Sequence, residues 1–115
     1  MSTKSLGKLI RRLRKQKGLS LRELANDVDV SHVNISHIEN GRVTTSRKVI
    51  QQLAKALDYD LDKLLAEGDI VGEDIEKIIK NTPTAVPEFL RTAKDLSEEE
   101  WRNLTEQVKN MKDKK

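Results

Sequence analysis

Residues 21–38 carry apolar side chains at the spacing of one buried face per helix. These positions are Leu24, Ala25, Val28, Val30, Ile35 and Ile38. The pattern predicts two short helices with only Asp29 and Val30 between them. Helices joined so closely must cross at a steep angle, and the small side chain of Ala25 lets them touch. This stretch therefore restricts the chain to a helical fold built around one tight corner.

The residues that flank this corner carry the chemistry of helix ends. Ser20 and Glu23 form a capping box, in which each side chain accepts a hydrogen bond from the other residue's backbone N–H. Ser31 is placed to cap the second helix, which we expect to end at Asn40 and Gly41. Two such helices form a helix-turn-helix, whose second helix enters the major groove of DNA.

Similar signals complete a five-helix domain over residues 1–68. We expect a helix at about residues 5–16, one that begins at Ser46, and a short one around 61–67. Their core positions are Leu6, Leu9, Ile10, Leu13, Val49, Ile50, Leu53, Ala54, Leu57, Leu61, Leu64 and Leu65. We find no strand candidate, so the prediction is an all-α fold.

The remaining residues, 69–115, are predicted to form a separate helical region. We expect helices at about 72–80 and 87–95, and a last helix that opens with a second capping box, Ser97 with Glu100. One face of the last helix carries an apolar stripe of Trp101, Leu104, Val108 and Met111.

The composition excludes several classes of protein. The chain has no cysteine, so neither disulfides nor thiolate-bound zinc contribute. No apolar run approaches the roughly 20 residues of a membrane-spanning helix. The N-terminus lacks the apolar core of a signal peptide. We therefore expect a cytoplasmic protein without a membrane partner and without a cofactor.

Charge is distributed unevenly along the chain. Residues 1–68 hold 13 Lys and Arg against 8 Asp and Glu, whereas residues 69–115 hold 9 against 11. Residues 1–22 hold eight basic residues and no acidic one. Such a segment is either a solvated helix face or the footprint of a polyanion partner, and the neighbouring helix-turn-helix favours the polyanion.

Residues 6–68 resemble the Cro/CI-type, or Xre, family of helix-turn-helix regulators. The matching positions are Arg11-x-x-Arg14, Gly18-Leu19-Ser20, Glu23-Leu24-Ala25, Val30-Ser31, Ile35-Ser36-x-Ile38-Glu39-x-Gly41 and Leu53-Ala54-x-Ala56-Leu57. The resemblance implies a five-helix, lambda-repressor-like domain that binds a double-stranded DNA operator.

Two positions depart from the family pattern. Asp29 stands where the family usually has glycine in the turn, and we expect it to tolerate a positive φ there. Thr44 and Thr45 stand where a proline usually precedes Ser46, so we expect a looser loop before the fourth helix.

The resemblance places the first turn of the helix after Ser31 in the major groove. The residues that would reach base edges are His32, Val33, Asn34, Ser36 and His37. Asparagine pairs with adenine, valine contacts the methyl group of thymine, and histidine donates to guanine or to phosphate. Alternatively, the two histidines are solvated residues of a helix face. No carboxylate or thiolate completes a metal site with them, so we expect no bound metal.

Phosphate contacts are predicted on both sides of this recognition helix. The residues are Arg22, Asn40, Arg42, Arg47 and Lys48. Arg22 lies near a helix start, where free backbone N–H groups also face anions, whereas Lys48 can equally be an ordinary surface lysine. The resemblance further implies that Arg14 pairs with Glu39, which makes Glu39 structural rather than a DNA contact.

The apolar residues of the C-terminal region can pack on their own chain or on a second copy. We favour dimerisation, because a two-fold symmetric duplex site calls for a two-fold protein. The interface residues are Phe89, Leu90, Trp101, Leu104, Val108 and Met111. The run Val86-Pro87-Glu88-Phe89-Leu90-Arg91-Thr92, followed by Glu100-Trp101 and an amphipathic helix, looks like the C-terminal part of DdrO/ImmR-type repressors. It is also loosely similar to the dimerisation tail of SinR-type regulators. The first similarity implies inactivation by a partner zinc metallopeptidase that cleaves this region.

These observations predict a homodimeric transcriptional repressor that binds a palindromic operator. The alternative is an antitoxin-like protein that neutralises a partner, such as a toxin protein, and regulates its own operon. An enzyme is a weaker hypothesis, because we find no Gly-rich phosphate loop, no metal constellation and no nucleophile beside a base.

Overall fold

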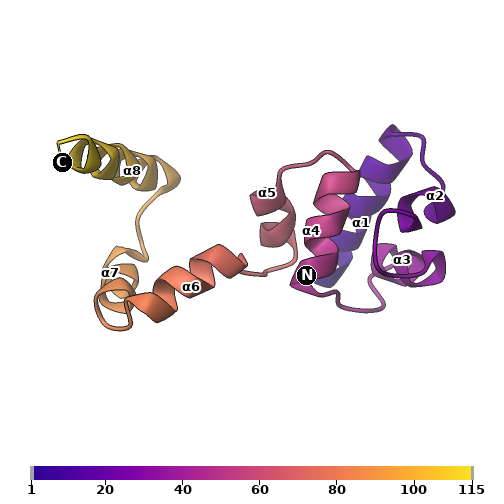
Figure 1. The fold of residues 1–115 in the computed structure, drawn as a ribbon, viewed down its shortest axis with the longest axis horizontal. Helices are drawn as coiled ribbons and strands as arrows, with labels where there is room; N and C mark the ends of the chain where they lie inside the picture. The colour runs from indigo at the N-terminus through magenta and orange to yellow at the C-terminus, as the bar shows by residue number, and fades with distance from the viewer. Residues whose placement is uncertain (1, 115) are drawn as a thin grey trace. The chain divides into compact units, whose positions relative to one another are not determined.

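The computed structural model describes residues 2–114, and the regular structure in that range is helical (Figure 1). The helices are α1 (Ser2–Gln16), α2 (Leu21–Ala25), α3 (His32–Glu39), α4 (Arg47–Ala56), α5 (Leu61–Glu67), α6 (Glu73–Asn81), α7 (Ala85–Ala93) and α8 (Glu98–Asp113). The all-α prediction is confirmed, and no strand occurs in the described part of the chain. None of the described helices is long and apolar enough to cross a bilayer.

The helices form two compact units, Met1–Glu76 and Lys77–Lys115, which we call the first and second units. The division lies within α6, eight residues beyond the boundary predicted after residue 68. Two interactions account for the difference. Ile70 packs against the core of the first unit, and Glu76 accepts a hydrogen bond from Arg47 of α4. The assignment of DNA binding to one part and regulation to the other stays a prediction.

The core of the first unit draws on its first five helices. Its buried members are Leu6, Leu9, Ile10, Leu24, Val28, Ile35, Ile38, Val49, Ile50, Leu53, Ala54, Leu57, Leu64 and Leu65. α1 packs against α3 and α5, α2 against α3, and α4 against α5. The predicted apolar faces are therefore correct with two exceptions: Leu13 is only partly buried against this core, and Leu61 is exposed. The exposed fraction of Leu61 is 37%, because it occupies the first position of α5, directly after the capping Asp60.

Four side-chain caps fix where the helices of the first unit begin. Ser20, Ser31, Ser46 and Asp60 each accept a hydrogen bond from the backbone N–H three residues later. The first three were predicted and are confirmed. α1 begins three residues earlier than predicted, so that Lys4 lies inside the helix.

The turn between α2 and α3 is longer than predicted. α2 ends at Ala25 and α3 begins at His32, so residues 26–31 form the connection rather than two residues alone. The backbone N–H groups of residues 26–28 donate to the carbonyl oxygens three residues earlier. This tight continuation of α2 keeps Val28 at the core, where it is 8% exposed.

The predicted positive φ at Asp29 is wrong. Among the described residues other than glycine, a positive φ occurs at Asp58 and Asp69. Asp29 is held instead by Gln52 of α4: its backbone N–H donates to Gln52 Oε1 at 2.9 Å, and its Oδ2 accepts from Gln52 Nε2 at 2.9 Å. These two hydrogen bonds stabilise the turn without a residue in the left-handed conformation.

Gly7 is the point where α1 and α3 cross. A Cβ atom placed on Gly7 would lie 2.4 Å from the carbonyl oxygen of Ile38 and 2.5 Å from that of Glu39. Both are backbone atoms that no side-chain rotation can move away. A residue with a side chain would push the two helices apart, so Gly7 sets how closely the end of α3 lies against α1.

α7 and α8 of the second unit meet through two aromatic rings. Phe89 and Trp101 have ring centroids 6.0 Å apart at an interplanar angle of 77°, an edge-to-face contact. α7 begins two residues earlier than predicted, and Pro87 lies in its first turn, where the missing N–H costs no helical hydrogen bond. The capping box of Ser97 and Glu100 is confirmed.

Candidate nucleic-acid interface

α3 presents one side to the core and the other to solvent. Ile35 and Ile38 are buried, whereas Val33 is 52% exposed. The other predicted base-contact residues, which are partly exposed, are His32, Asn34, Ser36 and His37. The backbone N–H of Asn34 donates to Ser31 Oγ at 3.1 Å, and this cap fixes the first turn of α3. The outward side of α3 thus combines an apolar contact with hydrogen-bond donors and acceptors, as base edges require.

The one acidic residue of α3, Glu39, is turned away from this face and neutralised. Arg14 Nε donates to Glu39 Oε2 at 2.7 Å, and Arg14 Nη2 donates to Glu39 Oε1 at 3.0 Å. The side chains are 11% and 4% exposed, respectively. The hydrogen bond to Glu39 raises the pKa of Arg14 above its ordinary value, against the opposing effect of burial. Because both charges are satisfied inside the domain, Glu39 does not repel a polyanion at the recognition helix.

Arg14 also ties this pair to the start of the helix-turn-helix. Its Nη1 donates to the carbonyl oxygen of Leu19 at 2.9 Å. The backbone there turns at Gly18, whose φ is +70°, and the N–H of Leu19 donates back to the carbonyl of Arg14 at 3.1 Å. One guanidinium therefore joins α1, the loop before α2 and the end of α3.

The predicted phosphate contacts lie in three different surroundings. Arg22, Asn40 and Arg42 are exposed. Lys48 is also exposed but forms an ion pair with Asp29, with 3.1 Å between Nζ and Oδ2. Because both side chains of that pair are largely solvated, a phosphate can replace the carboxylate at little cost. The four residues are all free to reach a phosphate, and their roles stay predictions.

Arg47 differs from the other four. Its Nη2 donates to Glu76 Oε2 at 2.5 Å, and its side chain is 30% exposed. Its Nε is buried without a hydrogen-bond partner in the described part of the chain. A phosphate contact by Arg47 stays a prediction that requires the guanidinium to leave or share Glu76.

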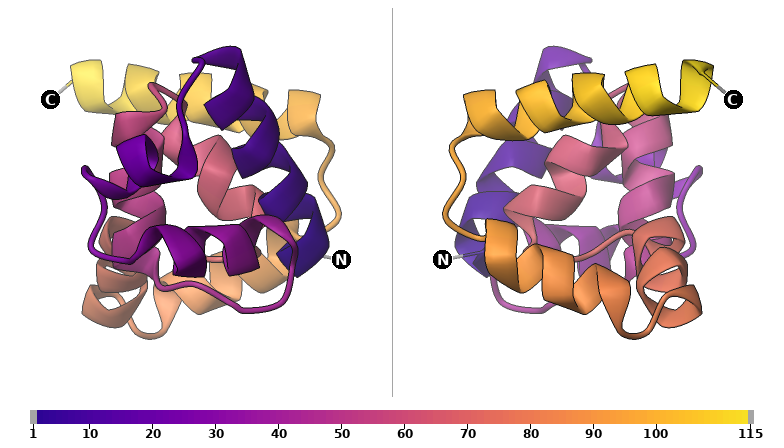
Figure 2. Two further views of the ribbon diagram at one scale, coloured as in Figure 1. Left: turned by 90° about the vertical axis from the view of Figure 1, so that its right-hand side faces the viewer. Right: turned by 90° about the vertical axis from the view of Figure 1, so that its left-hand side faces the viewer.

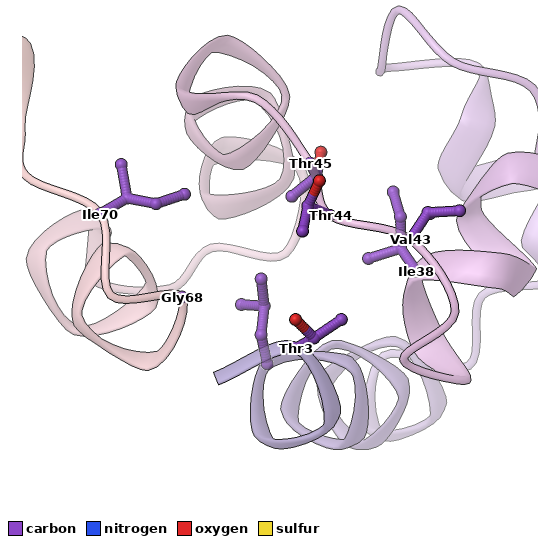
Figure 3. Close-up of a pocket in the computed structure, with 8 residues that line it drawn as sticks. Thr3, Ile38, Val43, Thr44, Thr45, Gly68 and Ile70 are labelled. Carbon is purple, nitrogen blue, oxygen red and sulfur yellow. The ribbon is translucent and has the colours of Figure 1, made fainter. Parts of the chain in front are cut away.

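The loop after α3 lines one side of a mainly apolar pocket of about 170 Å³ (Figure 3). The pocket is lined by Thr3, Leu6, Ile38, Val43, Thr44, Thr45, Gly68 and Ile70. Val43 packs against the core, and Gly41 has the left-handed φ of +71° that ends α3. These two residues anchor the loop on either side of Arg42, so its exposed guanidinium projects from a fixed position.

The histidines of α3 do not belong to a metal site in this structure. Within residues 2–114, no group of three histidine or carboxylate side chains is arranged to hold a metal ion. His32 and His37 are both partly exposed residues of the outward side of α3. The predicted role of both histidines as hydrogen-bonding contacts to bases or phosphates stays a prediction.

Three residues of this region were not singled out from the sequence. Gly7 sets the crossing of α1 and α3, Gln52 clasps the turn, and Glu76 holds Arg47. An isolated glycine inside a helical pattern is a signal of close packing, so Gly7 was recognisable. Gln52 and Glu76 act over 23 and 29 residues of sequence, and nothing local marks them.

The comparisons with known proteins agree with this geometry. A helix-turn-helix family model matches residues 10–64, which contain α2, α3 and α4. The ImmF control region 10 kDa protein of Bacillus phage phi105 is 38% identical over 71 residues, which cover 61% of this chain and 79% of that protein. The competence pilus inhibition repressor of Acinetobacter baylyi is 38% identical over 64 residues, which cover 54% of this chain and 58% of that protein.

A solved structure extends the likeness to three dimensions. The crystal structure of the clp gene regulator ClgR from Corynebacterium glutamicum matches with a TM-score of 0.53 and 32% identity. The match covers 60% of this chain and 90% of the ClgR chain. The chain belongs to the helix-turn-helix family of the Xre type and is a DNA-binding transcriptional regulator.

Proposed function

We propose that this protein is a homodimeric repressor that reads a palindromic operator through the outward side of α3. The observation that carries the proposal is the composition of that side: Val33 and polar side chains are exposed, while the acidic Glu39 is buried and paired. A helix with this surface satisfies both requirements of the major groove, base recognition and tolerance of negative potential. The name of the Acinetobacter relative supports repression as the regulatory outcome.

In this proposal different residues of α3 contact different groups of the bases. Asn34 pairs with an adenine through its amide, and Val33 contacts a thymine methyl group. Ser36, His32 and His37 add hydrogen bonds to bases or to neighbouring phosphates. Because Asn34 lies in the turn capped by Ser31, its backbone is held in place before DNA arrives.

Phosphate contacts set the register of the domain on the duplex. Arg22 and Lys48 act from the starts of α2 and α4, and Asn40 and Arg42 act from the end of α3. Such contacts add affinity for any sequence, and each raises the magnitude of the salt slope by about 0.9. Arg47 joins them if the phosphate displaces Glu76.

The second unit supplies the dimer in this proposal. Its helices leave large apolar side chains in solvent: Phe89 is 48% exposed, Leu90 41%, Val108 50% and Met111 64%. Trp101 and Leu104 are half-buried on the same stripe of α8. A second copy of this surface would cover these side chains and place two copies of α3 in successive major grooves, about one helical turn apart.

Two variants test the base and phosphate roles against each other. Binding to DNA upstream of the protein's own gene is measured across a salt series, for wild type, Asn34→Ala and Arg42→Ala. Asn34→Ala should lose about 1–3 kcal/mol of discrimination between operator and unrelated DNA. Arg42→Ala should weaken both by a similar factor and lower the salt slope by about 0.9. Wild-type binding without sequence preference would contradict the repressor and favour an antitoxin-like role in neutralising a partner protein.

We further propose that repression is relieved by separating α8 from the rest of the chain. A partner zinc metallopeptidase would do so by cleaving between Pro87 and Leu96, in the segment similar to DdrO/ImmR-type repressors. A chain that ends at Asp95 should then lose dimerisation and bind operator DNA more weakly. Unchanged dimerisation and operator binding by the shortened chain would contradict this route. The proposed role is regulatory and not enzymatic.

A further inference from the structure

Three basic side chains of α1 form a stripe beside the end of the recognition helix. Lys4, Lys8 and Arg11 are spaced four and three residues apart, so they follow one face of the helix. All three are exposed. Together with Glu39 and Asn40 they line one shallow depression in the surface of the first unit. We call Lys4, Lys8 and Arg11 the α1 stripe.

The close crossing at Gly7 brings the stripe to this place. Gly7 has no Cβ, so the last carbonyl groups of α3 approach the backbone of α1 directly. Gly41, just beyond α3, lies against Lys4: a Cβ on Gly41 would be 3.0 Å from Lys4 Cγ and 3.2 Å from its Cα. Figure 2, left, shows the first turns of α1 beside the end of α3. The stripe therefore continues the surface that carries Asn40.

The stripe is not paired with an acidic side chain of the described residues. Glu67, which lines a second depression with Lys8, accepts a hydrogen bond from Ser5 at 2.6 Å instead. None of its three side chains forms an ion pair with another residue between positions 2 and 114. The carboxylate of Glu39, which borders the depression, is engaged by Arg14. Residues 1–22 contain no acidic residue. Three solvated cations in a row, next to the end of a DNA-reading helix, produce a local positive potential.

We propose that the α1 stripe binds the phosphate backbone of duplex DNA beyond the phosphates reached by Asn40 and Arg42. This inference rests on the proposed function and extends its footprint from the helix-turn-helix onto α1. The ligand is the sugar–phosphate backbone, so the contribution is independent of sequence and sensitive to salt. The close approach at Gly7 holds the three charges at a constant distance from the bases read by α3.

The test compares two triple variants of equal charge in the full-length protein. The stripe variant is Lys4→Gln/Lys8→Gln/Arg11→Gln. The control variant is Lys55→Gln/Lys63→Gln/Lys94→Gln, whose residues are exposed, lie outside α1 and line no surface shared with Asn40. Binding of a fluorescent duplex from the protein's own upstream region and of an unrelated duplex is measured from 50 to 300 mM salt.

The stripe variant should lower the magnitude of the salt slope by about 0.9 for each phosphate that it no longer neutralises, and so by up to about 2.7. It should weaken both duplexes by the same factor and leave their affinity ratio unchanged. The control variant should change the slope by less than about 0.5. A charge-preserving variant, Lys4→Arg/Lys8→Arg/Arg11→Lys, should bind as wild type, which separates charge from folding.

Three results would overturn the proposal, and each has a different consequence. Equal salt slopes for the stripe and control variants, with sequence-specific binding by wild type, would reject the α1 stripe and leave the proposed function intact. Wild-type protein that fails to bind either duplex would reject both. A changed affinity ratio in the stripe variant would show that α1 reads sequence, which also contradicts the proposal.

Discussion

The two units of this protein use the same local signals but bury their apolar residues very differently. Each contains a capping box, Ser20 with Glu23 in the first unit and Ser97 with Glu100 in the second. Around the first box, a continuous core closes over α1 to α5. After the second box, α8 leaves Val108 and Met111 half or more exposed.

This difference separates what makes a helix from what makes a self-sufficient domain. Caps and apolar periodicity are enough to begin and orient a helix, and both units have them. Stability in water comes mainly from apolar surface removed from solvent. The first unit achieves this within one chain, whereas the exposed stripe of the second unit is completed in our proposal by a second copy.

The largest expected effect is the loss of stability caused by a cavity in the core of the first unit. Leu53 is fully buried at the centre of the core, so Leu53→Ala should lower the free energy of unfolding by about 2–5 kcal/mol. Met111→Ala, at a position 64% exposed, should change it by less than about 0.5 kcal/mol in the monomer. Urea denaturation at low protein concentration measures both. Similar losses of unfolding free energy in the two variants would contradict the contrast between a buried core in the first unit and an exposed apolar stripe in the second.

The next effect is the loss of the buried charge pair. Arg14→Met leaves the carboxylate of Glu39 buried without its cation and should cost about 3 kcal/mol. The double variant Arg14→Met/Glu39→Leu removes both charges and should recover most of that loss. Thermal melts followed by circular dichroism give the comparison. If the single variant is as stable as the double one, the pair does not hold the end of α3.

A smaller loss is expected where α1 and α3 cross. Gly7→Ala adds a methyl group that overlaps two backbone carbonyl oxygens, and it should destabilise the first unit by about 1–3 kcal/mol. Gly72→Ala, directly before α6, is a control for the added methyl group. The nearest atom to its Cβ is the movable end of the Asp74 side chain at 2.8 Å, and its other neighbours, Leu65 and Ile75, lie at 3.7 Å and 3.9 Å. In an unconstrained helix, glycine to alanine is stabilising, so a gain at Gly7 would refute the close approach. Denaturant midpoints provide the measurement.

The smallest effect is shared by both units and concerns pH. Hydrogen bonds from the backbone and hydroxyl of Ser20 lower the pKa of Glu23 below its ordinary value of 4.5, and those of Ser97 do the same for Glu100. A carboxylate with a lowered pKa in the folded state stabilises that state above pH 4.5 and loses this contribution as the pH falls below it. Helicity measured from pH 6 to pH 3 should decline less in Glu23→Gln and in Glu100→Gln. An unchanged pH profile in both variants would contradict the capping role.

The parts of the structure that follow from neighbouring residues were predictable. The serine caps, the glycine at the end of α3 and the apolar faces of α1 and α4 depend on spacings of three or four residues, and all are present. The family pattern also indicated the pairing of Arg14 with Glu39 across 25 residues, which spacing alone does not give.

The parts that escaped prediction depend on contacts between distant segments. The positive φ expected at Asp29 is absent because Gln52, 23 residues away, satisfies the turn instead. Arg47 is identical in type to Arg42, yet Glu76 engages it and leaves Arg42 exposed. Which arginine is available to a phosphate is therefore decided by packing, after the helices have assembled.

The most direct test of the division between the units is the number of chains bound to one operator. Sedimentation of the complex with a duplex from the upstream region should give two chains per duplex for wild type. Val108→Asp/Met111→Asp should give one chain per duplex at higher protein concentration, with melting of the first unit unchanged. A wild-type complex with a single chain, or a variant that still binds as two chains, would contradict the account. In that account the first unit binds the operator and the second unit mediates dimerisation.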